Sequence, residues 1–321
     1  MILTFLLLVL GFVALIFGAD ILVAGATTLA RKFRVSEAII GLTIVAFGTS
    51  MPEFVVNVSA AIEGSGDIAL ANVIGSNIFN VLGILGCSAL VIPLAVDTER
   101  RTIDIPVMIL TAIVVLFLGK NFFIDRLPQD VQYLSRLDGI VLLILFSAYM
   151  FYIVRKTLAQ RKENDQIIDE NDQKQSYGLV ALKIIGGLIL LVIGGRVIVN
   201  SAIKIAEYFH VSQRVIGLTI VSIGTSLPEL ATSVVAAFRR QADIAVTNIV
   251  GSNIFNALFI LGTTAVVRPV PVQPDSIIDL ILNLVLSLFL FAIVLGPKHR
   301  VGRIPGILML LAYVAYVIYL L

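Results

Sequence analysis

The second half of this chain repeats the first at a constant offset of 176 residues, and this repeat constrains the fold more than any other feature. GLTIVAFGTSMPE at 41–53 returns as GLTIVSIGTSLPE at 217–229, and DIALANVIGSNIFNVLGILG at 67–86 returns as DIAVTNIVGSNIFNALFILG at 243–262. Over residues 40–86, 28 of 47 ungapped positions are identical to their counterparts, many of them Gly, Thr, Ser, Pro, Glu and Asn. Chance similarity of apolar helices does not produce such identities, so the two halves must share one structure.

Long apolar windows dominate both halves. Of the 321 residues 59% are hydrophobic and only 14% are charged, whereas soluble domains carry about 25% charged residues. A membrane-spanning helix needs about 20 apolar residues, so this composition excludes a water-soluble fold and predicts an all-α integral membrane protein with about ten transmembrane helices. The windows are residues 2–29, 38–62, 68–92, 103–119, 137–154, 178–203, 213–238, 243–267, 276–296 and 304–321.

Five windows fall in each half, and five is an odd number. The second copy must therefore enter the membrane from the opposite side, which gives two inverted five-helix repeats with a substrate site expected at the midplane between them. We expect the first repeat at 1–154 and the second at 178–321. The segment 155–177 is too polar to enter hydrocarbon and is expected to be a cytoplasmic linker.

Lysine and arginine predict the orientation. The odd-numbered loops hold fifteen of these residues and the even-numbered loops hold six, so the positive-inside rule places both termini outside the cytoplasm. No basic residue precedes the first window, which we interpret as a retained span of a multi-pass plasma membrane protein rather than a signal peptide. A net charge of +2 without a long basic run indicates no nucleic-acid partner. The sequence leaves the oligomeric state open, and a monomer is the working expectation.

Each GTSxPE segment lies in the middle of an apolar window. Proline lacks an N–H group and clashes with the preceding turn, so the helix should break there. The next residues, Glu53 and Glu229, place carboxylates at mid-membrane, where an acidic residue marks an ion path or a buried partner. The available cations in a window, Lys183 and Arg196, lie in one repeat only, so an ion pair does not explain two symmetric glutamates.

Polar side chains spaced four residues apart form a stripe on one face of the third window, and the eighth window repeats it. The stripes could line a cation path or bond neighbouring helices to each other. Asn77 and Asn253 point about 100° away from them and are expected to bond between helices. The stripes consist of Asn72, Ser76 and Asn80, and of Asn248, Ser252 and Asn256.

Together these groups form an all-oxygen set that suits a hard cation. Ca²⁺ takes six to eight oxygen ligands, and two carboxylates match one divalent ion in charge. The same oxygens could bind Na⁺ or protons, and such competition is the physical basis of antiport. The hydroxyl groups of the two GTSxPE segments complete the set: Thr49, Ser50, Thr225 and Ser226.

Enzymatic function is not indicated. The histidines, His210 and His299, lie in predicted loops, so the sequence has no Ser–His pair, no HExxH motif and no His/Cys metal site. GSGD at 64–67 resembles the GxGD motif of intramembrane aspartyl proteases, but its counterpart at 240–243 reads RQAD and no second mid-membrane aspartate is evident. We expect a protein that is not an enzyme and holds no cofactor.

With GTSxPE and GSNxxN in each half, the chain resembles the calcium/cation antiporter superfamily, and specifically a prokaryotic sodium/calcium exchanger, over nearly its whole length. The resemblance implies exchange of Ca²⁺ for Na⁺ across the plasma membrane. It also implies four ion sites formed by the second, third, seventh and eighth spans, with the first and sixth spans sliding across them to alternate access.

The resemblance further implies which residues bind each ion. Well-known exchangers of this type carry aspartate at the position of Asn256, so the formal charge of this site is near −2 rather than −3. Ca²⁺/H⁺ exchange, K⁺-assisted exchange and a cation channel therefore remain alternatives. The implied ligands are Glu53, Glu229 and the carbonyls of Thr49 and Thr225 for Ca²⁺; Ala46, Thr49, Ser76, Ser222, Thr225 and Ser252 for Na⁺; and Asn80 and Asn256 in the middle.

Overall fold

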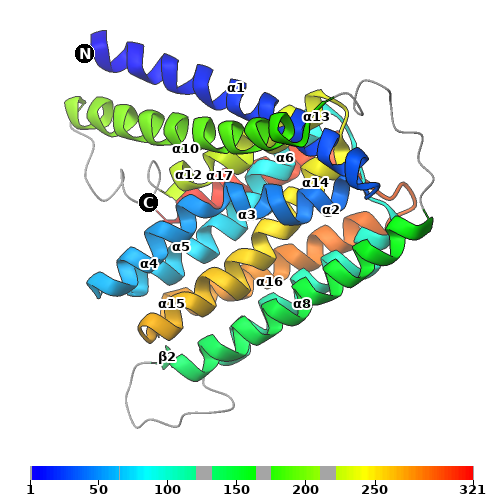
Figure 1. Cartoon of the computed structure of the whole chain (residues 1–321). Coiled ribbons are helices and arrows are strands. Elements are labelled where there is room, and N and C mark those ends of the chain that lie inside the picture. Colours follow the sequence, from blue (N-terminus) through cyan, green and yellow to red (C-terminus); the bar gives the residue numbers. More distant parts are fainter. Residues whose placement is uncertain (1, 65, 121–131, 164–174, 210–221, 321) are drawn as a thin grey trace.

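The computed structural model describes residues 2–64, 66–120, 132–163, 175–209 and 222–320, and these are overwhelmingly helical. Within these ranges eight helices are long and apolar enough to cross a membrane, and one bent helix pair makes a ninth span. The expected all-α membrane fold is confirmed, and Figure 1 shows the helices packed as one bundle. Residues 213–221, the start of the seventh window, lie outside the described ranges.

The first half contains five spans, of which the second is broken. They are α1 (Ile2–Phe33); α2 (Glu37–Ile40), the π-helix η1 (Gly41–Val45), α3 (Ala46–Thr49) and α4 (Met51–Glu63); α5 (Gly66–Phe79), η2 (Asn80–Ile84) and α6 (Leu85–Val91); η3 (Arg100–Asp104) and α7 (Ile105–Gly119); and α8 (Arg136–Glu163). Because α8 runs to Glu163, the segment expected as a linker is helical at its beginning.

The second half repeats this order. Its elements are α10 (Tyr177–Tyr208); α12 (Ser222–Thr225) and α13 (Leu227–Phe238); α14 (Ala242–Ile254), η5 (Phe255–Ile260) and α15 (Leu261–Val267); α16 (Pro274–Leu295); and α17 (Arg303–Leu320). Two short antiparallel pairings join the halves at opposite ends of the bundle (Figure 1): β1 (Leu94–Ala95) pairs with β4 (Arg300–Val301), and β2 (Gln132–Leu134) pairs with β3 (Val270–Val272).

The third and eighth spans form the centre of the bundle. In their apolar windows 83% and 94% of the residues are buried, against 22% in α1 and 11% in α17. The outer helices expose large apolar side chains, such as Ile16 and Leu308, as expected for surfaces that face lipid. The polar stripes of the third and eighth spans are thus shielded from the bilayer by the other spans.

Helices α1 and α10 lie side by side along one face of the bundle (Figure 1) and pack antiparallel through glycines. A Cβ atom on Gly11 would lie 3.1 Å from the carbonyl oxygen of Gly194, and one on Gly18 would lie 3.0 Å from that of Gly187. Gly187 and Gly194 are the repeat counterparts of Gly11 and Gly18. Small residues allow membrane helices to approach this closely, so α1 and α10 form one tightly joined pair.

Both ends of the chain lie at the same end of the bundle, whereas the end of α8 and the start of α10 lie at the opposite end (Figure 1). An odd number of spans in each half requires this arrangement.

Candidate functional site

Both GTSxPE segments interrupt their helices. Helix α3 ends at Thr49 and α4 begins at Met51, with a bend of 44° between the two halves of the span. Ser50 lies between them with φ −83° and ψ 8°, and Ser226 repeats this conformation between α12 and α13 with φ −91° and ψ 10°. Proline follows in the first turn of each new helix, where its missing N–H leaves no helical bond unmade. The helix breaks expected from the motif are confirmed.

Each break supplies a serine to the glutamate of the other repeat. Ser226 Oγ donates a hydrogen bond of 2.9 Å to Glu53 Oε1, and Ser50 Oγ donates one of 2.7 Å to Glu229 Oε1. Both glutamates are only 1% exposed. They lie in the first turns of α4 and α13, where the helix dipole favours a negative charge. The two carboxylates therefore belong to one site that forms only when the halves are docked.

No lysine or arginine forms an ion pair with Glu53 or Glu229 within the part of the chain that the structure describes. Lys183 Nζ donates instead to Gln175 Oε1 at 2.7 Å, and Arg196 lines a cavity of about 180 Å³ without an ion pair to either glutamate. A buried charge without a partner is costly. The pair of carboxylates is therefore suited to a positively charged ligand or to protons.

The polar stripes lie against the breaks, as expected. Ser76 Oγ is 3.2 Å from Ser226 Oγ, and Ser252 Oγ is 3.0 Å from Ser50 Oγ. One turn away, each threonine hydroxyl faces an asparagine of the other repeat. Thr49 Oγ1 donates to Asn248 Oδ1 at 3.3 Å, and Thr225 Oγ1 donates to Asn72 Oδ1 at 3.5 Å.

Four buried oxygens of the predicted site residues have no hydrogen-bond partner within the described structure: Glu53 Oε2, Glu229 Oε2, Asn80 Oδ1 and Asn256 Oδ1. Buried polar atoms are nearly always partnered, so these unpartnered acceptors need an explanation. Among the described residues, no three or more His, Cys, Asp or Glu side chains are grouped so that they could hold a metal ion. A cation bound here would rely on two carboxylates and neutral oxygens, which suits Ca²⁺ or Na⁺ better than a soft metal.

The structure describes Ala46 and Ser222, two further predicted Na⁺ ligands, in less detail. Ala46 is buried, and its carbonyl oxygen accepts the N–H of Ser50 at 3.1 Å and lies 3.3 Å from the hydroxyl oxygen of Thr49. Ser222 is the first residue of α12, and its side chain lies outside the described part of the structure.

Sequence reasoning missed Asn57 and its repeat counterpart Ser233, which are both fully buried. Asn57 Nδ2 donates to the backbone carbonyl of Glu53 at 2.7 Å, while Ser233 Oγ accepts a bond of 3.0 Å from Asn248 Nδ2. Each residue follows its glutamate by four positions, on the same helix face. That spacing was the available signal for finding them.

The two sides of the site differ in exposure. Thr49 and Asn248 are fully buried, whereas Thr225 and Asn72 are partly exposed. Thr225 also lines the cavity of about 180 Å³, together with Arg196 and both prolines of the breaks. In Figure 1, α12 lies toward the end of the bundle that holds both chain ends. The site is therefore less tightly enclosed beside Thr225 and Asn72 than beside Thr49 and Asn248.

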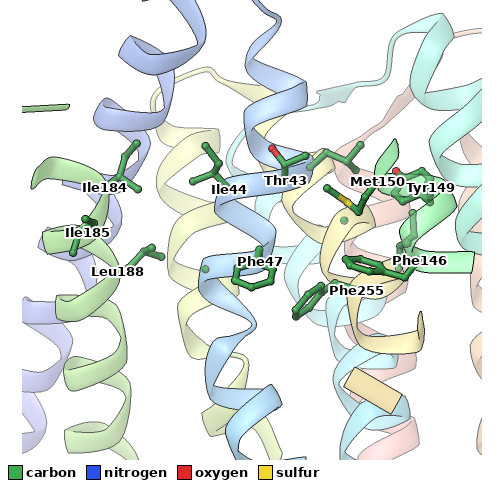
Figure 2. Close-up of a pocket in the computed structure, with 14 residues that line it drawn as sticks. Thr43, Ile44, Phe47, Phe146, Tyr149, Met150, Ile184, Ile185, Leu188 and Phe255 are labelled. Carbon is green, nitrogen blue, oxygen red and sulfur yellow. The ribbon is translucent and has the colours of Figure 1, made fainter. Parts of the chain in front are cut away.

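A larger cavity of about 450 Å³ lies between α3, α8, α10 and α14, on the apolar side of the second span. Figure 2 shows Phe47, Phe146 and Phe255 gathered at its wall, and the ring centroids of Phe47 and Phe255 are 4.8 Å apart. None of its lining residues carries a charge, and the hydroxyl of Thr43 is bonded to its own helix. Cation chemistry therefore belongs to the polar cluster and not to this cavity.

Comparisons with known proteins agree along the whole chain. A family model described as sodium/calcium exchanger protein matches residues 3–155 and 179–321. The inner membrane protein YrbG of Escherichia coli is 36% identical, over 92% of this chain and 91% of its own. The sodium/calcium exchanger MaX1 of Methanosarcina acetivorans is 30% identical, over 98% of both chains. A structure of the sodium-calcium exchanger NCX_Mj, soaked with Na⁺ and Sr²⁺, superimposes with a TM-score of 0.83 at 32% identity, covering 99% of this chain and 98% of that one.

Proposed function

Because this chain belongs to the sodium/calcium exchanger family, whose model matches both of its halves, we propose that it exchanges Ca²⁺ for Na⁺ across the plasma membrane by alternating access. Membership makes the chain a membrane transporter of the cation antiporter kind. The choice of Na⁺ as coupling ion is the proposal. The observation that carries it is the buried pair of glutamates without a cationic partner among the described residues. Each glutamate keeps one oxygen without a hydrogen-bond partner, and so do Asn256 and Asn80 in η5 and η2, the segments that pack against α4 and α13.

In this proposal one Ca²⁺ neutralises the two glutamates, and Na⁺ occupies oxygens that surround the same position. Because the sets share residues, binding of one ion disfavours the other, and the protein changes its open side only with the site filled. We assign Ca²⁺ to the carboxylates of Glu53 and Glu229 and the carbonyls of Thr49 and Thr225; Na⁺ to Ala46, Thr49, Ser76, Ser222, Thr225 and Ser252; and supporting roles to Ser50, Ser226, Asn72, Asn248, Asn80 and Asn256.

The charge distribution supports an orientation with both chain ends outside the cytoplasm and the linker inside. The partly exposed pair of Thr225 and Asn72 would then face the outside. This conformation would admit ions from the external solution.

Transport into proteoliposomes tests the coupling ion. Vesicles loaded with Na⁺ should take up Ca²⁺, whereas vesicles loaded with K⁺ or carrying only a pH gradient should not. Uptake driven by the pH gradient alone would instead establish Ca²⁺/H⁺ exchange, and dependence on K⁺ together with Na⁺ would establish K⁺-assisted exchange. Uptake that is indifferent to the internal cation would contradict antiport and indicate a channel.

Asn256→Asp should change inhibition by Na⁺ and by protons more than it changes Ca²⁺ binding. Ca²⁺ is already neutralised by two glutamates, whereas a third carboxylate offers a new site to Na⁺ or a proton. A unit charge about 4 Å away contributes roughly 1 to 4 kcal/mol, depending on solvation. We expect the half-inhibiting Na⁺ concentration for Ca²⁺ uptake to shift by about tenfold, with a smaller change in the KM for Ca²⁺. Asn256→Gln is the neutral control, and equal shifts for all three ions would argue against this assignment.

A further inference from the structure

Four asparagines form a closed set of hydrogen bonds where the third span meets the eighth. We call this set the asparagine clasp: Asn77, Asn80, Asn253 and Asn256. All four side chains are at most 2% exposed. Asn77 Nδ2 donates to the backbone carbonyl of Asn253 at 3.3 Å, and Asn253 Nδ2 donates to that of Asn77 at 3.4 Å. Asn80 Nδ2 donates to Asn253 Oδ1 at 2.9 Å, and Asn256 Nδ2 donates to Asn77 Oδ1 at 3.1 Å.

This pattern has only one possible polarity. A backbone carbonyl can only accept a hydrogen bond, so Asn253 must turn its NH₂ group toward the carbonyl of Asn77. Its own Oδ1 is then left facing Asn80, which must donate its NH₂ group in turn. By the repeat symmetry the same sequence runs from the carbonyl of Asn253 through Asn77 to Asn256. The two backbone carbonyls therefore fix the positions of Oδ1 and Nδ2 in all four side-chain amides.

The consequence appears at the other end of the two outer amides. Asn80 Oδ1 and Asn256 Oδ1 remain buried and without a hydrogen-bond partner in the described structure, as do the outer oxygens of Glu53 and Glu229. A side-chain amide has nearly the same shape after a half-turn, but that turn would replace the free oxygen by an NH₂ group. An NH₂ group carries partial positive charge and repels a cation. A neutral asparagine serves as a cation ligand only if its orientation is held.

We propose that Asn77 and Asn253 are positioning residues, which bind no ion themselves but hold the amide oxygens of Asn256 and Asn80 toward the transported cation. Because this role rests on the proposed exchange function, it predicts how ion affinity responds to changes at two residues outside the set of assigned ligands.

The test uses the symmetry of a carboxylate, which has an acceptor oxygen on both sides and needs no orientation. Asn253→Leu should raise the KM for Ca²⁺ by about 10- to 100-fold, the usual effect of removing the partner of a ligand, and should change the maximal rate much less. In an Asn80→Asp background, Asn253→Leu should leave the KM unchanged or lower it. In that background Asn253 Oδ1 faces a carboxylate oxygen instead of an NH₂ group, and the leucine removes this repulsion. The pair Asn77→Leu and Asn256→Asp gives a second, independent cycle.

Each variant is purified and its KM for Ca²⁺ uptake is measured in proteoliposomes, beside Ca²⁺ binding by calorimetry and thermal stability in the absence of ions. A loss of affinity that is the same in both backgrounds would overturn the positioning role, because a defect in helix packing does not depend on the chemistry of residue 80. A variant that fails to fold in one cycle leaves the other cycle to decide. Wild-type protein that neither binds nor takes up Ca²⁺ would instead refute the proposed function.

Discussion

Ca²⁺ uptake by the Glu53→Gln variant should fall by at least about a hundredfold. The substitution preserves the size of a side chain that is 1% exposed and keeps one oxygen to accept the bond from Ser226. It removes one of the two negative charges that match a divalent ion. With the remaining oxygen bonded to Ser226, an NH₂ group takes the place of the free Oε2. Loss of even an outer-shell partner of a ligand typically costs about 10- to 100-fold in affinity, so loss of a charged ligand should cost more. Glu229→Gln should behave alike.

The matched control is Glu63→Gln, on the same helix α4 but exposed at its last turn. This variant should transport Ca²⁺ at the wild-type rate in the same Na⁺-loaded vesicles. Without ions, the Glu53→Gln and Glu229→Gln variants should be at least as stable as the wild type, because each substitution removes a buried charge that has no cationic partner in the protein. Normal uptake by a folded Glu53→Gln protein would remove Glu53 from the site.

Exchange should stop when α10 is covalently fixed to α12. A Cβ atom on Gly224 would lie 3.5 Å from Val199 Cβ, which falls within the range of disulfide geometry. In a Cys87→Ser background, Val199→Cys with Gly224→Cys should exchange ions when reduced and lose nearly all Ca²⁺ uptake when oxidised. The physical reason is that the family resemblance implies alternating access by sliding of the first and sixth spans, α1 and α10, across the ion-binding spans.

The control crosslink joins α10 to α1 instead. A Cβ atom on Gly25 would lie 3.0 Å from Lys183 Cβ, so Gly25→Cys with Lys183→Cys forms a comparable bridge after a small adjustment. Because the glycine contacts join α1 and α10 into one pair, this bridge should leave uptake within about twofold of the reduced protein, a difference of less than about 1 kcal/mol in the barrier. Loss of uptake in both oxidised proteins would contradict sliding of the pair as a unit.

Much of the fold was accessible from sequence because its determinants are local. Apolar windows of bilayer length predicted the spans, and proline in GTSxPE predicted the two breaks that the structure shows at Ser50 and Ser226. The linker at 155–177 stays a prediction, and α8 continues into it as far as Glu163. Charged residues are excluded from hydrocarbon, but nothing prevents a helix from extending beyond the membrane into water, and charge alone could not locate its end.

The sequence predicted which residues form the polar cluster, but not which of them form hydrogen bonds with each other. The i, i+4 spacing placed Asn72, Ser76 and Asn80 on one face, and the repeat doubled that set. Spacing within one helix cannot say which group on another helix it meets. Asn57 was missed for a different reason. Its partner, the backbone carbonyl of Glu53, lies four residues earlier in the same helix, but an asparagine in a helix has many alternative uses.

By itself the sequence determined that this is a membrane protein built from two related halves, each with a broken span, a mid-membrane glutamate and a polar stripe. These follow from periodicity, from proline chemistry and from the cost of burying charge, which act over a few residues. Only the tertiary structure decided that Ser50 bonds to Glu229 while Ser226 bonds to Glu53, and that Asn80 bonds to Asn253 while Asn256 bonds to Asn77. Those contacts join residues more than a hundred positions apart, and they exist only once the halves have docked around their shared centre.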